Sequence, residues 1–396
     1  MRTPALKLHF FLLYGIAGAY LPYAPVFLAR DLGMPDWQIG WVTGSYGLAV
    51  LLAPPLMATL ADRKVDGRLL MAGGYGLSAL ALVAFAGVTG FAPAVALAVA
   101  YGLVYTPMTP LLDGIVFSDM SRERAAGRSP PSYSALRVWG SFGFMAPAVG
   151  LFAVMHYGLM GGRAAIYAAA LVSGLALACA PLLPKIVPEA LGPGVPAAAA
   201  WAELRRPPTA SLIGALVLLF AAISVFYAFY PRLVVEVGID PAWVGLVTNV
   251  GVLAELPWMI FAAPLLRRFG VRALLLVGAA SLAVRLVVLA ALPGPATVVA
   301  TQVLHGPAVL ALYVLPPMIL DHKAAPGFRN SVQGLYAGLC YGAARVVGAG
   351  AGGHAAEYGL AWAFALAGAL AVAAALWLAL AWRDPAAEAA LRGPRA

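Results

Sequence analysis

The chain has 396 residues, of which 63% are hydrophobic and only 10% are charged, and its formal net charge is +9. A mean hydropathy of +0.89 with so few charges lies far outside the range of soluble domains. This composition excludes a soluble globular protein and predicts an integral membrane protein. The only two cysteines, Cys179 and Cys340, lie within predicted helices and indicate neither a disulfide framework nor a metal site.

Long apolar runs recur from one end of the chain to the other. A bilayer core of about 30 Å is crossed by roughly 20 helical residues, and these runs are too long and too uniform to be barrel strands. We therefore predict an all-α integral membrane fold. Its twelve transmembrane helices are expected at residues 6–29, 38–61, 69–89, 93–118, 133–157, 163–183, 209–235, 243–266, 272–292, 296–320, 330–353 and 360–382.

A Pro- and Ala-rich stretch at residues 184–208 divides the chain in the middle. It is predicted to be a cytoplasmic linker between an N-terminal six-helix half, 1–183, and a C-terminal six-helix half, 209–382, followed by a cytoplasmic tail, 383–396. The connection PPLMATLADRKVDGRLL after the second helix has a counterpart, APLLRRFGVRALL, after the eighth. This repetition indicates a duplicated bundle, which favours a transporter.

Lys and Arg residues gather in the loops on one side of the predicted helices. Because short cytoplasmic loops retain positive charge, we expect both termini to be cytoplasmic in a multi-pass protein of the cell membrane, inner or plasma. Arg30, Arg163 and Arg232 are the expected external exceptions. The distribution accounts for a pI near 9.7 without nucleic acid as a partner.

Ionisable residues also lie inside the predicted helices. A charge at the bilayer centre costs about 2.5 to 3.5 kcal/mol on insertion scales, so such residues are expected to face the bundle interior and to mark a substrate or ion pathway. A structural alternative is that some form salt bridges or extend to the membrane surface. The set consists of Asp113, Arg137, Glu255, Arg285, His305 and Arg345.

Asp113 and Arg137 are predicted to lie at similar depth, each about 7 Å from the same end of its helix at about 1.5 Å per residue, so that they can meet. Helical spacing places Ser141 and Phe144 on the same face as Arg137, and Tyr105 on the same face as Asp113. A guanidinium, a carboxylate, hydroxyls and an aromatic ring are therefore expected to converge on a substrate.

Seven motifs follow one another along the chain: GAYLPYAPVFL (18–28), ADRKVDGR (61–68), PLLDG (110–114), YSALRVWGSFGF (133–144), GVLAELPW (251–258), QVLHGPA (302–308) and QGLYAGLCYGAARVVG (333–348). As an ordered set they resemble the major facilitator superfamily, and within it the branch that contains lactose permease and the phenylpropionate permeases. The resemblance implies alternating access, with Asp62 and Arg63 as gating residues.

By this resemblance, Asp113, Arg137, Ser141 and Phe144 match positions that bind sugar in lactose permease. We include Tyr20 and Tyr105 in the predicted substrate site. Phe144 stands where lactose permease has Trp, which argues against a galactoside. An Arg fork also suits a carboxylate, as a phenylpropionate-like substrate would require.

The C-terminal half carries Glu255, Arg285, His305 and Arg345 at mid-depth. The resemblance assigns Glu255 to substrate binding and Arg285 and His305 to proton coupling, and we include Arg345 in the predicted proton-coupling group. The helix-ten carboxylate of lactose permease is replaced by Ala308. Glu255 or Asp113 must then carry the proton. Two carboxylates beside three arginines leave this predicted cavity net positive, which favours an anionic substrate.

The sequence therefore predicts a monomeric secondary active transporter for a small organic solute, either an aromatic carboxylate or a sugar- or nucleoside-like compound. Proton symport is the expected coupling, driven by the proton gradient with no cofactor and no metal. Two alternatives remain open, a proton-coupled drug or metabolite exporter and an integral-membrane enzyme. The histidines show no paired metal spacing and no catalytic triad clusters in sequence, so the protein is not expected to be an enzyme.

Overall fold

The structure, a computed structural model, describes residues 3–62, 65–159, 161–185, 201–202, 204–323 and 329–392, with the side chains of 54–62 and 329–331 outside the description. Helices joined by short turns make up this part of the chain, and no strand occurs in it. Several helices, such as α19 (Leu360–Leu380), are apolar around their whole circumference. That pattern is typical of helices surrounded by protein on one side and lipid on the other.

The chain folds into two compact units. Unit 1 consists of Met1–Met34, Leu48–Gly192 and Asp240–Leu246, and unit 2 consists of Pro35–Gly47, Pro193–Ile239 and Val247–Ala396. Two short segments, Pro35–Gly47 and Asp240–Leu246, are thus each grouped with the unit that holds the other half of the sequence. The predicted linker lies largely outside the described residues.

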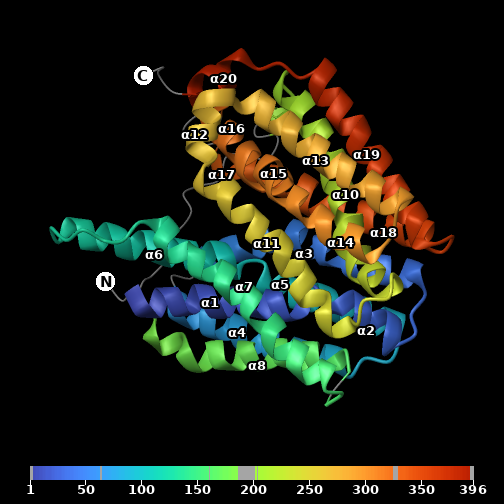
Figure 1. The fold of residues 1–396 in the computed structure, drawn as a ribbon. Helices are drawn as coiled ribbons and strands as arrows, with labels where there is room; N and C mark the ends of the chain where they lie inside the picture. Colours follow the sequence, from blue (N-terminus) through green and yellow to red (C-terminus); the bar gives the residue numbers. More distant parts are fainter. Residues whose placement is uncertain are drawn as a thin grey trace. The chain divides into compact units, whose positions relative to one another are not determined.

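In unit 1, α1 lies beside α7 and α8, and α4 lies beside α5 and α8 (Figure 1). Glycines bring α1 and α7 together, because a Cβ on Gly18 would overlap the backbone of Phe144 and one on Gly143 would overlap the backbone of Phe11. The helices of unit 1 are α1 (Thr3–Tyr20), α2 (Ala24–Arg30), the later part of α3 (Asp36–Asp62), α4 (Gly67–Ala86), α5 (Phe91–Tyr105), α6 (Met108–Ala125), α7 (Tyr133–His156), α8 (Arg163–Cys179), η1 (Ala180–Leu182) and η2 (Pro241–Trp243).

In unit 2, α19 lies beside α10 and α13 (Figure 1), and α18 packs against α10. Gly40 and Gly44, in the first part of α3, contact Ala349 and its neighbours on α18, as their spacing indicates. The helices of unit 2 are α10 (Thr209–Glu236), most of α11 (Val244–Ile260), α12 (Ala262–Phe269), α13 (Val271–Ala291), α14 (Pro295–Ala300), η3 (Thr301–Leu304), α15 (His305–Val309), η4 (Leu310–Val314), α16 (Leu315–Lys323), α17 (Arg329–Ala337), η5 (Gly338–Ala343), α18 (Ala344–Ala356), α19 and α20 (Pro385–Arg392).

Every predicted membrane run coincides with helix in the structure. Among the described residues, ten helices are long and apolar enough to cross a membrane, so the number twelve stays a prediction. The largest difference falls in the run predicted at 93–118. There α5 ends at Tyr105, and α6 starts at Met108 and continues to Ala125. Pro107 explains the break, because a proline lacks the amide proton that a continuous helix needs.

Candidate functional site

Arg137 of α7 points toward α1, where it meets Tyr14. Its Nη2 donates a hydrogen bond to the Tyr14 hydroxyl, and its Cζ lies 3.9 Å from the centre of the Tyr14 ring. Gly140 leaves room for this arrangement, since a Cβ there would lie 2.8 Å from both Arg137 Nη1 and Tyr14 Cδ2. The guanidinium is therefore held by a hydroxyl and an aromatic face together, which is a favourable setting for a partly desolvated cation.

Asp113 of α6 accepts a hydrogen bond from the Tyr133 hydroxyl at 2.8 Å, and Tyr133 stacks on Phe117 with ring centres 4.8 Å apart. In the part of the chain that the structure describes, Asp113 and Arg137 form no direct ion pair, unlike the meeting predicted from their depth. Because α6 runs on to Ala125, Asp113 lies farther from the end of its helix than predicted. We call Tyr14, Asp113, Tyr133 and Arg137 the unit 1 cluster.

The other predicted residues of unit 1 surround this cluster in different ways. Ser141 and Phe144 follow Arg137 along α7 and are half-buried. Tyr105 is buried, and its hydroxyl donates to the Leu13 carbonyl at 2.8 Å. Tyr20 is also buried, against Tyr101 at 4.9 Å between ring centres. Both tyrosines occupy packing positions in this structure, and their contact with substrate stays a prediction.

The predicted polar residues of helices eight, nine and ten come together in unit 2. Glu255 Oε1 on α11 lies 3.1 Å from His305 Nε2 on α15, and His305 Nδ1 lies 2.7 Å from Arg285 Nη1 on α13. Arg285 Nη2 donates to Gln302 Oε1 on η3. We call this chain of Glu255, His305, Arg285 and Gln302 the unit 2 cluster.

The partners of His305 determine which of its ring nitrogens carries the proton. A guanidinium has only donors, so His305 Nδ1 must accept from Arg285. The proton of the neutral imidazole is then on Nε2, which donates to the Glu255 carboxylate. Arg285 therefore fixes the tautomer, as the partners of a functional histidine commonly do.

Burial increases along this chain from Glu255 to Arg285. The Glu255 side chain is 20% exposed and that of His305 is 8% exposed, whereas Arg285 is 0% exposed. The Arg285 Cζ lies 3.8 Å from the centre of the Phe226 ring, and Arg285 makes no ion pair with any residue that the structure describes. The carboxylate of Glu255 is therefore the most exposed member of the cluster.

Arg345 is separate from the unit 2 cluster. Its Nε donates to the Thr43 carbonyl at 3.4 Å, and its Cζ lies 4.8 Å from the centre of the Tyr46 ring. Its predicted membership of a proton-coupling network stays a prediction. The predicted gating pair falls outside the described residues, since only the backbone of Asp62 is described and Arg63 is not described at all.

Two π-helical turns, η4 and η5, carry an aromatic group in unit 2. Tyr313 of η4 and Tyr341 of η5 are stacked with ring centres 5.5 Å apart, and Phe220 meets the edges of both rings. Tyr313 is still 36% exposed. Short π-helical turns within helices occur frequently at functional sites, so these rings can offer stacking surfaces to a ligand.

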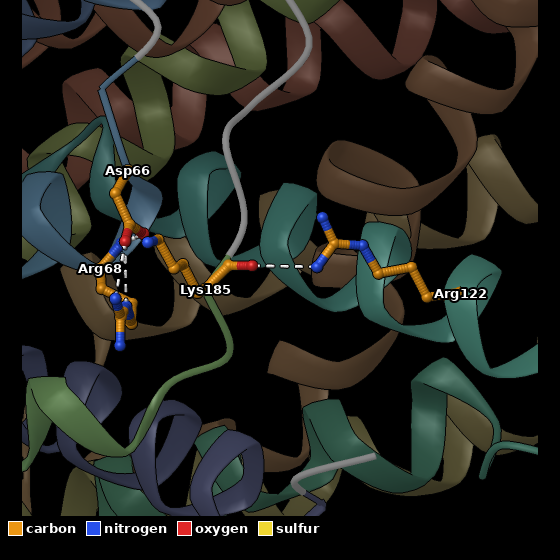
Figure 2. A network of polar contacts seen from close by, with 4 residues as sticks. All are labelled: Asp66, Arg68, Arg122 and Lys185. Atoms are coloured by element: carbon orange, nitrogen blue, oxygen red, sulfur yellow. Dashed lines mark hydrogen bonds and ion pairs between the residues drawn. The ribbon is translucent and has the colours of Figure 1, made fainter.

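One end of unit 1 carries a polar network on the connection that follows α3 (Figure 2). Asp66 accepts from the Arg68 amide at 3.0 Å and pairs with the Arg68 guanidinium at 2.8 Å. Arg122 of α6 donates to the Lys185 carbonyl at 2.9 Å. Asp66 is the N-cap of α4, a role that sequence reasoning missed although Asp before a helix is a standard signal.

Sequence reasoning also missed the residues that hold the predicted charges. Tyr14 and Tyr133 bind Arg137 and Asp113, and Gln302 binds Arg285. Gln302 lies in the motif QVLHGPA, three residues before His305, so one helical turn could have indicated it. Tyr133 lies one turn before Arg137. Nothing in the local sequence marks Tyr14 as the partner of a residue in another helix.

A bundle of membrane-length helices with charged clusters within them defines a multi-pass membrane transporter for small solutes. Solved structures of transporters share this fold. The nucleoside transporter NupG superposes with a TM-score of 0.82 at 18% identity over 97% of this chain and 100% of that chain. A point mutant of the peptide transporter POT superposes with a TM-score of 0.73 at 16% identity over 96% of this chain and 94% of that chain.

The chain belongs to the MFS_1 like family, which it matches over residues 4–366, and it is thus a transporter of the major facilitator type. It is 29% identical to the maltose permease of Geobacillus stearothermophilus over 77% of this chain and 75% of that protein. It is 26% identical to the putative nucleoside transporter YegT of Escherichia coli strain K12 over 89% of this chain and 84% of that protein. The superfamily predicted from the motifs is confirmed.

Proposed function

We propose that this protein is a proton symporter that imports a neutral, polyhydroxylated solute, a sugar or a nucleoside, by alternating access of its two six-helix halves. Asp113, Arg137 and Phe144 of unit 1 are proposed to bind the solute. The observation that carries the proposal is the unit 2 cluster, in which one partly exposed carboxylate is linked to a buried arginine through a histidine of fixed tautomer.

Two of the three arginines already have partners within the protein. This favours a neutral solute over the aromatic carboxylate, which the sequence allowed as an alternative. Arg285 is completely buried and already bound to His305 and Gln302. Arg345 is turned toward a backbone carbonyl and a tyrosine ring. Arg137 bonds Tyr14 through Nη2, and we propose that the rest of its guanidinium, together with the Asp113 carboxylate, binds the hydroxyl groups of a sugar or ribose.

The named relatives support the same class of substrate. One is a maltose permease and the other a putative nucleoside transporter, and both names describe compounds with several hydroxyl groups and a ring. Carboxylates and arginine supply hydrogen-bonding partners for such hydroxyls. Phe144, Tyr313 and Tyr341 supply ring faces in the two units.

The proton is proposed to bind Glu255. In the ionised state its bond to the His305 Nε2–H is charge-assisted, and charge-assisted bonds are about twice as strong as neutral ones. Protonation weakens this bond and frees the carboxyl group to change partner. Arg285 occupies the other ring nitrogen, so His305 cannot take a second proton there without losing that bond.

Both termini are proposed to be cytoplasmic in an inner or plasma membrane, since the basic loops would then follow the positive-inside rule. The gradient of protons supplies the energy and no cofactor takes part. One chain carries both clusters, so a monomer is sufficient.

The test is uptake into proteoliposomes whose interior is alkaline, with maltose, uridine and phenylpropionate as solutes. Accumulation of maltose or uridine that is lost in Arg137→Lys supports the proposal. Arg124→Lys is the matched control, because Arg124 is exposed on α6 of the same unit, and it is expected to transport normally. Accumulation of phenylpropionate alone, or normal uptake by Arg137→Lys, would contradict the proposed substrate class or site.

A further inference from the structure

The last helix that the structure describes, α20, packs against α12, α13 and α16 at one end of unit 2. Figure 1 shows it beside α12, near the C-terminus. Asp384 precedes it as a cap, accepting from the Ala387 amide at 3.1 Å. Ala387 and Trp382 are completely buried. Ala387 is the one fully buried residue of α20, and Trp382 anchors the segment that leads into it.

Polar contacts at α20 join the ends of several other helices. Asp384 pairs with Lys323 at the end of α16, and Lys323 also donates to Thr209, the first residue of α10, at 3.2 Å. Arg392 donates to the Phe269 carbonyl at the end of α12, at 3.1 Å. Arg392 is held in turn by Glu388, with Nε 3.1 Å from Oε1.

Glu388 also caps α13. The amide of Arg272, the second residue of α13, donates to Glu388 Oε2 at 3.1 Å. A carboxylate at this place satisfies an amide that no residue of α13 itself can bond, and it complements the positive end of the helix dipole. Arg272 then reaches the end of α19, where its guanidinium donates to the carbonyls of Trp382 at 3.1 Å and Ala379 at 2.6 Å.

In the first repeat the helix that corresponds to α13 is α4, and the residue directly before α4 caps it. There Asp66 is the N-cap of α4, and it accepts from the amide of Arg68, the second residue of that helix, at 3.0 Å. At the corresponding position of the second repeat the N-cap is Gly270, which has no side chain. Glu388 fills the space where a Gly270 Cβ would lie, and Gly270 has a φ of +82°, a conformation that other residues adopt only under strain.

We propose that α20 is a clasp that closes this end of unit 2, and that Glu388 supplies the helix cap that the second repeat lacks. The clasp joins α10, α12, α13, α16 and α19 so that their ends move as one piece during transport. No contact between Glu388 and the unit 2 cluster occurs within the described ranges. Opening the clasp is therefore expected to lower the maximal transport rate and leave KM unchanged. This functional part rests on the proposed transport activity.

The test uses the full chain and measures amide hydrogen exchange in the first turn of α13. Glu388→Ala is expected to speed exchange at Arg272 and the following amides about fivefold, the size of one lost cap. Asp66→Ala is the matched control, and it should speed exchange at the start of α4 and leave α13 unchanged. Glu388→Gln keeps an accepting oxygen and should stay close to wild type, which separates the cap from general misfolding.

A variant at the N-cap position gives a second result. Gly270→Asp is expected to speed exchange at α13, because the new side chain meets Glu388 and because residues other than glycine adopt a φ of +82° only under strain. Unchanged exchange at the first turn of α13 in Glu388→Ala would overturn the cap.

Uptake by Glu388→Ala tests the functional part. A lower maximal rate at unchanged KM supports the clasp, and a normal rate with fast exchange at α13 would overturn its role in transport. The exchange measurement needs no solute, so it stands even where the wild type moves none of the offered compounds. Failure of the proposed substrate class is thereby distinguishable from failure of the clasp.

Discussion

The two polar clusters contain similar residue types but connect them differently. In unit 1, Arg137 and Asp113 are held by separate tyrosines, Tyr14 and Tyr133. In unit 2, Glu255, His305, Arg285 and Gln302 form one continuous chain. Separate pairs can exchange their partners one at a time, as ligand binding requires. In the proposed mechanism, the continuous chain carries a change of charge at Glu255 to the buried arginine when a proton binds.

Arg285 is more deeply buried than Arg137, and this difference predicts the largest effect on the free energy of unfolding. Arg285→Ala removes a guanidinium that is 0% exposed and leaves two buried acceptors, on His305 and Gln302, without their donor. At about 1 to 3 kcal/mol for each acceptor, this should lower the free energy of unfolding by about 2 to 6 kcal/mol. Arg137→Ala, at a half-buried position, should lower it by about 1 to 2 kcal/mol. Thermal unfolding in detergent measures both, and equal losses would remove the distinction between the clusters.

The continuity of the unit 2 cluster predicts that its residues are energetically coupled. The double variant Glu255→Gln with Gln302→Leu should differ from the sum of the single variants by about 1 kcal/mol or more. Tyr14→Phe with Tyr133→Phe in unit 1 should be additive within about 0.5 kcal/mol, because each tyrosine holds a different charge. Both double-mutant cycles can be measured by the same thermal unfolding assay. Additivity in unit 2 would show that the chain of contacts carries no coupling.

The tyrosines of unit 1 predict a moderate effect on substrate affinity. Tyr14→Phe and Tyr133→Phe each remove one hydrogen bond to a charged group and keep the ring, at a cost of about 1 kcal/mol. We expect KM to rise about fivefold in each. Tyr157→Phe is the control, because Tyr157 is 76% exposed. The measurement is the KM of solute uptake for each variant. Values close to that of the wild type would mean that Tyr14 and Tyr133 do not orient the proposed binding residues.

The smallest effect concerns the Asp66 cap outside the membrane-length helices. Burial opposes ionisation of Asp66, but its hydrogen bonds and charge interaction with Arg68 outweigh this and hold the pKa of the carboxyl below its usual value. The carboxylate therefore adds stability above about pH 4, the usual Asp value, and this stability is lost as the pH falls below it. Asp66→Ala should lower stability by about 1 kcal/mol at pH 7 and remove the acid-dependent part. The measurement is thermal unfolding of the wild type and of Asp66→Ala over a series of pH values. Identical dependence of stability on pH in the two proteins would mean that the cap has no effect.

The positions of the long helices along the sequence were predictable from hydropathy, because a membrane helix must be apolar over a fixed length. All the predicted runs coincide with helix. The break at Pro107 and the extension of α6 were missed, since the polar residues between Ser118 and Ala125 gave no membrane signal. Helices can continue beyond a membrane wherever their amides are satisfied.

The candidate site was predictable in its residues but not in all of its pairings. The scarcity of charge in a membrane singled out Asp113, Arg137, Glu255, Arg285 and His305, and the last three do meet. The tyrosine partners were missed because they depend on which helix crosses which, and that is decided by glycine contacts far apart in the sequence. The role of Glu388 at α13 was missed for the same reason.

The most direct test of the proposed division of labour compares two carboxylate variants in proteoliposomes. Glu255→Gln should still exchange solute for solute across the membrane at equal concentrations, but should show no accumulation and no proton influx under an inward proton gradient. Asp113→Asn should lose exchange and accumulation together, because it removes a binding group. Gradient-driven accumulation by Glu255→Gln at the wild-type level would contradict the assignment of the proton to the unit 2 cluster.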